Sequence, residues 1–210
     1  MDRRAFFDSV RHSLFVGKLT QAQVEGMIFL LDAFEKKGVS ERNYAAYMLA
    51  TAFWETARTM HPVRETLASS DDQAIRVLDT AYARGRLPWV RKPYWRKDAD
   101  GKSWLGRGYV QLTHKANYQK ATDELGVDLV GSPSLAMDPA IAAAIMIEGM
   151  EEGWFTGKTL DQYIDDKDEA DSEDLREYRT ARPIINGTDK AEQIALIAVK
   201  FEEALRTAGY

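Results

Sequence analysis

The chain has 210 residues, of which 45% are hydrophobic and 29% are charged, and its formal net charge at pH 7 is -5. This length and composition predict a globular protein with one sizeable core, either a single domain or a domain with a small lobe. The chain contains no cysteine and only three histidines, so disulfides and thiolate nucleophiles are excluded and a histidine-rich metal site is not expected.

The N-terminal segment does not resemble an export signal. Asp8, Arg11 and His12 interrupt its apolar residues, and no run in the chain approaches the length of a transmembrane helix. We therefore expect a protein that is synthesised and folded in the cytoplasm and does not insert stably into a membrane.

Hydrophobic periodicity and capping residues predict a mostly helical chain. The expected helices cover residues 3–14, 21–37, 41–59, 71–84, 114–125, 139–152, 173–181 and 189–207. The best candidate for a strand is the segment 109–112, and the long non-helical stretch 88–108 is typical of a functional loop.

Two glutamates flank the end of the third predicted helix. Glu55 follows Tyr47, Met48 and Thr51 at helical spacing, so we expect it on a face with large apolar side chains, where burial raises the pKa of a carboxyl. Pro62 prevents the helix from continuing and places Glu65 on the loop beyond it. In the simpler alternative, Glu55 forms an ion pair with Arg58 on the helix surface and Glu65 is solvated.

Charge is distributed unevenly along the chain. Residues 161–177 are strongly acidic, which indicates a solvated loop and the start of a helix. Residues 84–102 are basic, and four aromatic residues lie among or next to these charges: Trp89, Tyr94, Trp95 and Trp104. Such aromatics can stack on nucleic-acid bases or on sugar rings, or they can cover the core.

A second polar cluster lies in the segment 106–118. Gly106 and Gly108 allow a close approach of the backbone to a ligand. If the segment is extended, Gln111 and Thr113 point the same way, and Asn117 follows one helical turn later. These uncharged groups suit hydroxyl and acetamido groups, although Thr113 could simply cap the next helix and Gln111 could satisfy a turn.

Three separated motifs resemble glycoside hydrolase family 19, the plant-type chitinases and the related phage and bacterial endolysins. The motifs are Glu55-Thr56-Ala57 with Pro62-Val63-Arg64-Glu65, the segment from Gly106 to Tyr118, and Ile184-Ile185-Asn186-Gly187-Thr188. The segment from Glu148 to Gly157 is similar to the endolysin-like branch.

The resemblance implies a mainly α, lysozyme-like fold with a deep substrate cleft and at most a small β-hairpin, formed by one catalytic domain over residues 1–210. It implies that Glu55 is the general acid, Glu65 the general base, and Thr113 a residue that helps to hold the attacking water. It also implies saccharide-binding or supporting roles for Gln111, Asn117 and Asn186, and we add Tyr94 and Trp95 as candidate sugar contacts.

The implied reaction is inverting hydrolysis of a β-1,4 bond beside an N-acetylated sugar, which needs carboxyl groups about 6.5–9.5 Å apart. Peptidoglycan is the expected substrate and chitin the alternative, while a non-catalytic saccharide-binding relative is the alternative of another class. No cofactor, metal or nucleic acid is expected, and the protein is expected to be a monomer. An endolysin of this kind stays in the cytoplasm until a separate membrane pore releases it to the cell wall.

Overall fold

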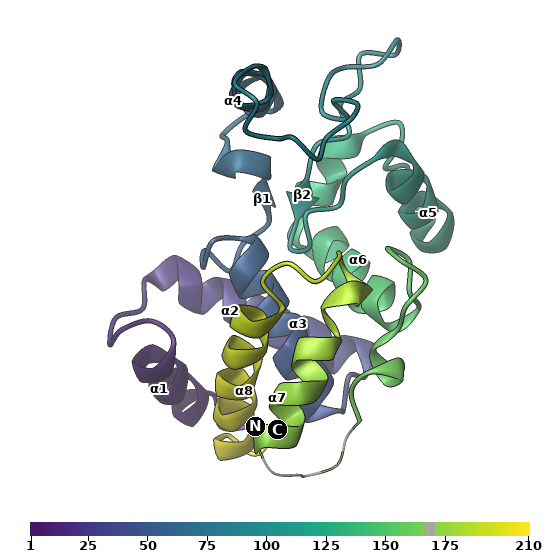
Figure 1. Ribbon diagram of the computed structural model, residues 1–210. Coiled ribbons are helices and arrows are strands. Elements are labelled where there is room, and N and C mark those ends of the chain that lie inside the picture. Colours follow the sequence, from purple (N-terminus) through teal and green to yellow (C-terminus); the bar gives the residue numbers. More distant parts are fainter. Residues whose placement is uncertain (166, 168–170) are drawn as a thin grey trace. The chain divides into compact units, whose positions relative to one another are not determined.

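The structure is a computed structural model that describes residues 1–165, 167 and 171–210. The described residues form two compact units, one of residues 1–61 and 146–210 and the other of residues 62–145. The α-helices in these residues are α1 (Arg3–Ser13), α2 (Gln21–Lys37), α3 (Arg42–Glu55), α4 (Asp71–Ala83), α5 (Lys115–Leu125), α6 (Pro139–Glu151), α7 (Asp171–Thr180) and α8 (Ala191–Thr207). Two short strands, β1 (Val63–Arg64) and β2 (Arg107–Gly108), are the only paired ones in the described part (Figure 1).

This mainly α, lysozyme-like fold with one very small sheet is the fold class predicted from the sequence. The substrate cleft and the single catalytic domain stay predictions. No helix among the described residues is long and apolar enough to cross a bilayer.

The unit of residues 1–61 and 146–210 is organised around α3. The residues from Ala45 to Phe53 are all buried, because this helix is apolar on every side and is therefore enclosed by its neighbours. It packs along α8, and α8 in turn packs along α7 and α1 (Figure 1). The two chain ends meet in this unit, where the Asp2 amide donates to the Ala208 carbonyl at 2.7 Å.

The unit of residues 62–145 contains the sheet, α4, α5 and the first turns of α6. Its strands are antiparallel, with Val63 opposite Gly108 and Arg64 opposite Arg107. A separate apolar cluster fills the space beside α4 and consists of Ala68, Ala74, Leu78, Trp95 and Leu105.

The capping residues account for most of the helix boundaries. Thr20 and Gln23 form a capping box at the start of α2, and Gly38 ends that helix in the left-handed conformation. Ser70 caps α4 through the amide of Gln73, and Asp138 accepts hydrogen bonds from two amides of the first turn of α6.

Several sequence-based predictions of helix ends and of the strand were wrong. The helix expected to reach residue 59 ends at Glu55, because Ala57 and Arg58 have positive φ angles of 49° and 68°. In the segment expected as a strand at 109–112, residues 109–111 form a tight turn with Gln111 at φ 54°, and only Leu112 is paired, in an isolated bridge with Arg107. The last helix was expected from residue 189 and begins at Ala191. Residues 166 and 168–170 of the acidic stretch lie outside the described residues.

Candidate active site

Glu55 lies at the C-terminal end of α3, with its side chain only 17% exposed. Its Oε1 accepts a hydrogen bond from the Arg182 guanidinium, and the distance from Arg182 Nη2 is 2.9 Å. Burial raises the pKa of the Glu55 carboxyl, and the charge and hydrogen bond of Arg182 oppose this rise without cancelling it. The nearby charge of Asp189 adds to the rise. Glu55 is thus a carboxyl that holds its proton to higher pH than an ordinary glutamate does.

The sequence pointed to the wrong partner for Glu55. Arg58 is exposed, and its guanidinium lies over the Phe53 ring, 5.8 Å from the ring centre. The ion pair is made by Arg182, which is 127 positions away in sequence and enters through the short helix η4 (Arg182–Ile184). In the sequence, the only indication that Arg182 belongs to the site is its position two residues before the Ile184–Thr188 motif.

Glu65 lies directly after β1, at the start of the short helix η1 (Glu65–Leu67). Both of its carboxylate oxygens accept hydrogen bonds. Tyr94 Oη donates to Oε1 at 2.7 Å, and the Gly106 amide donates to Oε2 at 2.8 Å. The Glu65 amide donates to the Gly106 carbonyl at 2.7 Å, so main chain and side chain are both anchored to Gly106. This carboxylate therefore has a fixed orientation.

Tyr94 holds Glu65 through its hydroxyl, and its predicted sugar contact stays a prediction. Burial raises the pKa of its hydroxyl, and the negative charge and hydrogen bond of Glu65 raise it further, so the hydroxyl stays protonated and donates. Its ring packs on His114, with 4.5 Å between ring centres. Tyr94 therefore orients the Glu65 carboxylate from the side of the long 88–108 loop.

Gln111 supports the turn between β2 and α5. Its Nε2 donates to the carbonyls of Val63 at 3.0 Å and Gly108 at 3.1 Å, which ties the turn to β1. The expectation that Gln111 and Thr113 project in parallel from an extended segment was wrong, because Gln111 has left-handed backbone geometry. The alternative prediction, in which the Gln111 side chain satisfies backbone groups of a turn, agrees with these two hydrogen bonds of its side-chain amide.

Thr113 precedes α5, Asn117 lies in its first turn, and both are partly buried. Thr113 does not cap the helix, since His114 is the residue at the N-cap and makes no side-chain cap bond. Neither Thr113 nor Asn117 has a side-chain hydrogen-bond partner among the described residues, so their polar groups are available to a ligand.

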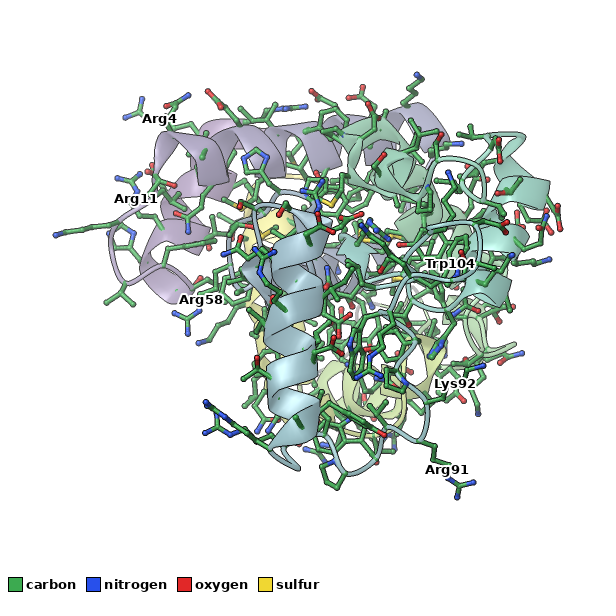
Figure 2. The ribbon with its side chains drawn as sticks, turned by 90° about the horizontal axis from the view of Figure 1, so that it is seen from above. Arg4, Arg11, Arg58, Arg91, Lys92 and Trp104 are labelled. Atoms are coloured by element: carbon green, nitrogen blue, oxygen red, sulfur yellow. The ribbon has the colours of Figure 1, made fainter. Side chains whose placement is uncertain are left out.

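Trp95 cannot be a sugar contact. It is fully buried in the cluster beside α4, where its Nε1 donates to Asp79 Oδ1 at 2.9 Å. The alternative prediction, that this aromatic residue belongs to the core, describes Trp95, because an indole with no exposed face cannot stack on a saccharide. Trp89 is 72% exposed, and Arg91 and Lys92 beside it point away from the protein (Figure 2).

Asn186 is exposed, in the loop between η4 and α8. Its backbone amide donates to the Arg182 carbonyl at 3.2 Å, and its side-chain Oδ1 accepts from the Gly187 backbone amide at 2.9 Å. The predicted residues thus fall into two groups. Glu55 and Asn186 are both linked to Arg182 in one unit. In the other unit, Glu65 and Gln111 lie next to Gly106, and Tyr94 donates to Glu65.

Comparison with known proteins finds a family that part of the chain matches. Residues 79–158 match the family profile described as chitinase class I, which is glycoside hydrolase family 19. The resemblance to this family noted in the sequence is confirmed over these residues. Gln111, Thr113 and Asn117 lie within the matched residues, whereas Glu55 and Glu65 precede them, so their catalytic roles stay predictions.

Two curated relatives come from rice, Oryza sativa subsp. japonica. The protein named Chitinase 11 is 37% identical over 97 residues, which cover 41% of this chain and 36% of the relative. The protein named Chitinase 8 is 29% identical over 133 residues, which cover 60% of this chain and 51% of the relative. The matches thus span only about a third to a half of the relatives' length. No solved structure matches the chain significantly.

Proposed function

We propose that this protein is an inverting glycoside hydrolase that cleaves β-1,4 bonds in the glycan strands of peptidoglycan. The observation that carries the proposal is the buried Glu55 carboxyl with a raised pKa, at the position that resembles the family's general acid. An acid catalyst must still hold its proton near the working pH, and burial is the usual way in which a protein achieves this.

In the proposed reaction, Glu55 gives its proton to the glycosidic oxygen as the bond from that oxygen to the anomeric carbon breaks. A water molecule attacks the anomeric carbon from the opposite face, and its proton passes to Glu65. The two hydrogen bonds from Tyr94 and Gly106 support this role, because they hold the Glu65 carboxylate in one orientation. The Thr113 hydroxyl helps to hold the water.

Peptidoglycan is proposed because the segment from Glu148 to Gly157 resembles the endolysin-like branch of the family. Chitin is the second candidate, and the observation that favours it is that both rice relatives carry the name chitinase. Both polymers contain β-1,4-linked N-acetylated sugars, so the same two carboxyl groups serve either reaction.

The deciding experiment is mass spectrometry of the products after parallel digestion of purified peptidoglycan and chitin oligomers. We expect soluble peptidoglycan fragments, whose reducing sugar identifies the bond: N-acetylmuramic acid for a muramidase, N-acetylglucosamine for a glucosaminidase. Proton NMR during the first minutes should show the α-anomer if the configuration is inverted. Products from chitin alone would move the assignment to chitinase, and no products from either polymer would indicate a saccharide-binding protein without activity.

The proposal includes storage in the cytoplasm before release to the cell wall. Fractionation of cells that express the chain alone, and of cells that also express a membrane pore, tests this part. We expect the protein in the soluble fraction in the first case and lysis in the second.

A further inference from the structure

Two side-chain contacts join α3 to the end of α7. The rings of Tyr47 and Tyr178 stack with 5.8 Å between their centres and 7° between their planes. Two helical turns further along α3, Glu55 accepts from Arg182. Tyr178 and Arg182 are themselves four residues apart, and the Ala181 amide donates to the Glu177 carbonyl, so the helical turn of α7 extends to the residue directly before Arg182. Both contacts therefore belong to one interface.

Thr51 lies between these two contacts, one helical turn after Tyr47 and one turn before Glu55. It is fully buried. A threonine inside a helix commonly donates to the carbonyl four residues earlier. Thr56 does so, with 2.7 Å from its Oγ1 to the Ala52 carbonyl, whereas Thr51 makes no such bond. The Thr51 hydroxyl is therefore left for another polar group in the interface.

Three buried polar atoms in this interface have no hydrogen-bond partner in the described part of the chain: Tyr47 Oη, Thr51 Oγ1 and Arg182 Nη1. Tyr47 is fully buried, and Arg182 is 5% exposed. Leaving a buried donor or acceptor unsatisfied is costly, especially on a charged group. The three atoms complement one another, because Nη1 can only donate while each hydroxyl can both accept and donate.

The Tyr47 hydroxyl lies within the electrostatic reach of the Glu55–Arg182 pair. Burial raises its pKa, the positive charge of Arg182 lowers it, and the negative charge of Glu55 raises it, with a net rise. Tyr47 is therefore a neutral hydroxyl at any working pH. A neutral hydroxyl can accept a hydrogen bond from a guanidinium without cancelling its charge.

We propose that Tyr47 is a positioning residue for Glu55: bridging water joins its hydroxyl to Arg182 Nη1 and to the Thr51 hydroxyl, because none of the three atoms bonds another directly. In this arrangement one amino group of Arg182 is held by Tyr47 through water and only the other donates to Glu55. The catalytic consequence rests on the proposed function, in which Glu55 is the acid, but the arrangement itself does not.

The arrangement limits how strongly Arg182 favours the ionised form of Glu55. The groups that act on Glu55 are Arg182, which favours the carboxylate, and burial and Asp189, which favour the acid. A two-pronged contact with a guanidinium stabilises a carboxylate more than a single hydrogen bond does. Without the Tyr47 hydroxyl, the second amino group of Arg182 turns to Glu55 and the pKa of Glu55 falls.

The test compares Tyr47→Phe with Tyr178→Phe in the full-length chain. Both substitutions remove a hydroxyl from a buried ring of the same stacked pair, but the Tyr178 hydroxyl donates to Glu202 rather than facing Arg182. The first readout is the pKa of Glu55 from carbon-13 NMR of the carboxyl, assigned with Glu55→Gln. We expect Tyr47→Phe to lower it by about one unit and Tyr178→Phe to leave it unchanged.

The second readout is the pH dependence of kcat on the polymer that wild type cleaves. Because the protonated acid is the active form, a fall of one unit moves the high-pH limb down by one unit and reduces kcat on that limb about tenfold. KM should stay the same, since a fully buried ring cannot touch substrate. If wild type cleaves neither polymer, the proposed function fails while the NMR titration still tests the arrangement.

Thr51→Val provides an independent test, because valine keeps the shape of the side chain and removes the second hydroxyl of the proposed hydrogen-bond arrangement. We expect a smaller fall of the Glu55 pKa in the same direction. A Glu55 pKa that is unchanged or raised in folded Tyr47→Phe overturns the proposal. So does an equal shift in Tyr178→Phe, which would indicate loosened packing of the ring pair.

Discussion

At the scale of the residue, the two candidate carboxyl groups have contrasting surroundings. Glu55 is buried beside one guanidinium, and burial outweighs that positive charge, so its acid form is favoured. Glu65 is partly exposed and accepts from a tyrosine hydroxyl and a backbone amide. Environments that differ in this way commonly separate an acid from a base in one enzyme.

Replacing Glu55 by Gln tests the acid directly. The shape is kept while the proton donor is lost, so lytic activity should fall by at least the ~10²–10⁴-fold associated with general acid catalysis. Circular dichroism should show an unchanged fold. Full activity in the folded variant would exclude Glu55 as the acid.

The same variant has a pH-dependent effect on stability. Because the Glu55 pKa is raised in the folded state, the native protein binds the proton more tightly than the unfolded chain. Wild type therefore loses stability as pH rises from the ordinary glutamate pKa to the raised one, and Glu55→Gln lacks this loss. Denaturant melts at pH 4 and pH 7 should show the variant gaining stability relative to wild type at the higher pH.

Gly106 is the residue to which Glu65 is anchored, and a side chain there has no room. A Cβ at this position would lie 2.8 Å from Gln111 Oε1 and 3.4 Å from Glu65 Oε2. We expect Gly106→Ala to displace both side chains and to lower kcat about 10²-fold, the loss typical of a small misplacement of a catalytic group. Steady-state kinetics with a thermal melt checks this. An unchanged kcat would show that the anchoring of Glu65 is not needed.

At the scale of the element, Asp71 joins the sheet to α4. It is the first residue of α4, and its carboxylate accepts from Arg64 Nε at 2.7 Å and Arg107 Nη2 at 2.6 Å. These two arginines face each other across β1 and β2. Partial burial raises the pKa of Asp71, but the hydrogen bonds and charges of Arg107 and Arg64 outweigh it and hold that pKa below the usual range.

We expect Asp71→Asn to destabilise the protein by about 2 kcal/mol, the scale of a hydrogen bond to a charged group. The Arg107 side chain is fully buried, but Asp71 is 33% exposed, so the larger cost of breaking a fully buried pair does not apply. In wild type this contribution is present above the ordinary aspartate pKa and is lost as pH falls through the lowered one. Chemical denaturation at pH 7 and pH 2.5 measures it, and an equal loss at both values would contradict this account.

At the scale of the whole molecule, each of the two units has its own apolar core. The unit of residues 62–145 depends on Trp95, whose ring packs edge-on against Tyr82 and Tyr94 at 5.8 and 5.1 Å between centres. A buried tryptophan in such a cluster contributes to stability rather than to binding.

Trp95→Ala should therefore cost about 3–5 kcal/mol, the usual loss for a buried aromatic, and should lower the melting temperature markedly. Trp89→Ala is the matched control, because Trp89 lies in the same loop and is 72% exposed. Its melting temperature should stay within a degree or two of wild type. Equal melting temperatures for the two variants would place Trp95 outside the core.

The sequence by itself determined the helices and most of their ends, because caps such as Thr20, Ser70 and Asp138 act within a few residues of the helix they start. It also showed the resemblance to family 19, since Gly106 to Tyr118 and the other motifs are contiguous segments. The buried state of Glu55 followed from helical spacing on α3. Each of these properties depends on neighbours in sequence.

The tertiary structure decided what depends on distant neighbours. In the structure, Glu55 pairs with Arg182 and not with Arg58, with 2.9 Å between Arg182 Nη2 and Glu55 Oε1. Tyr94 donates a hydrogen bond to Glu65, and the buried Trp95 donates one to Asp79. The tertiary structure also turned residues 109–111 of the expected strand into a tight turn, because Gln111 adopts a positive φ and its amide binds Val63. No local pattern encodes these contacts, since their energies arise only when segments far apart in sequence are brought together by the cores.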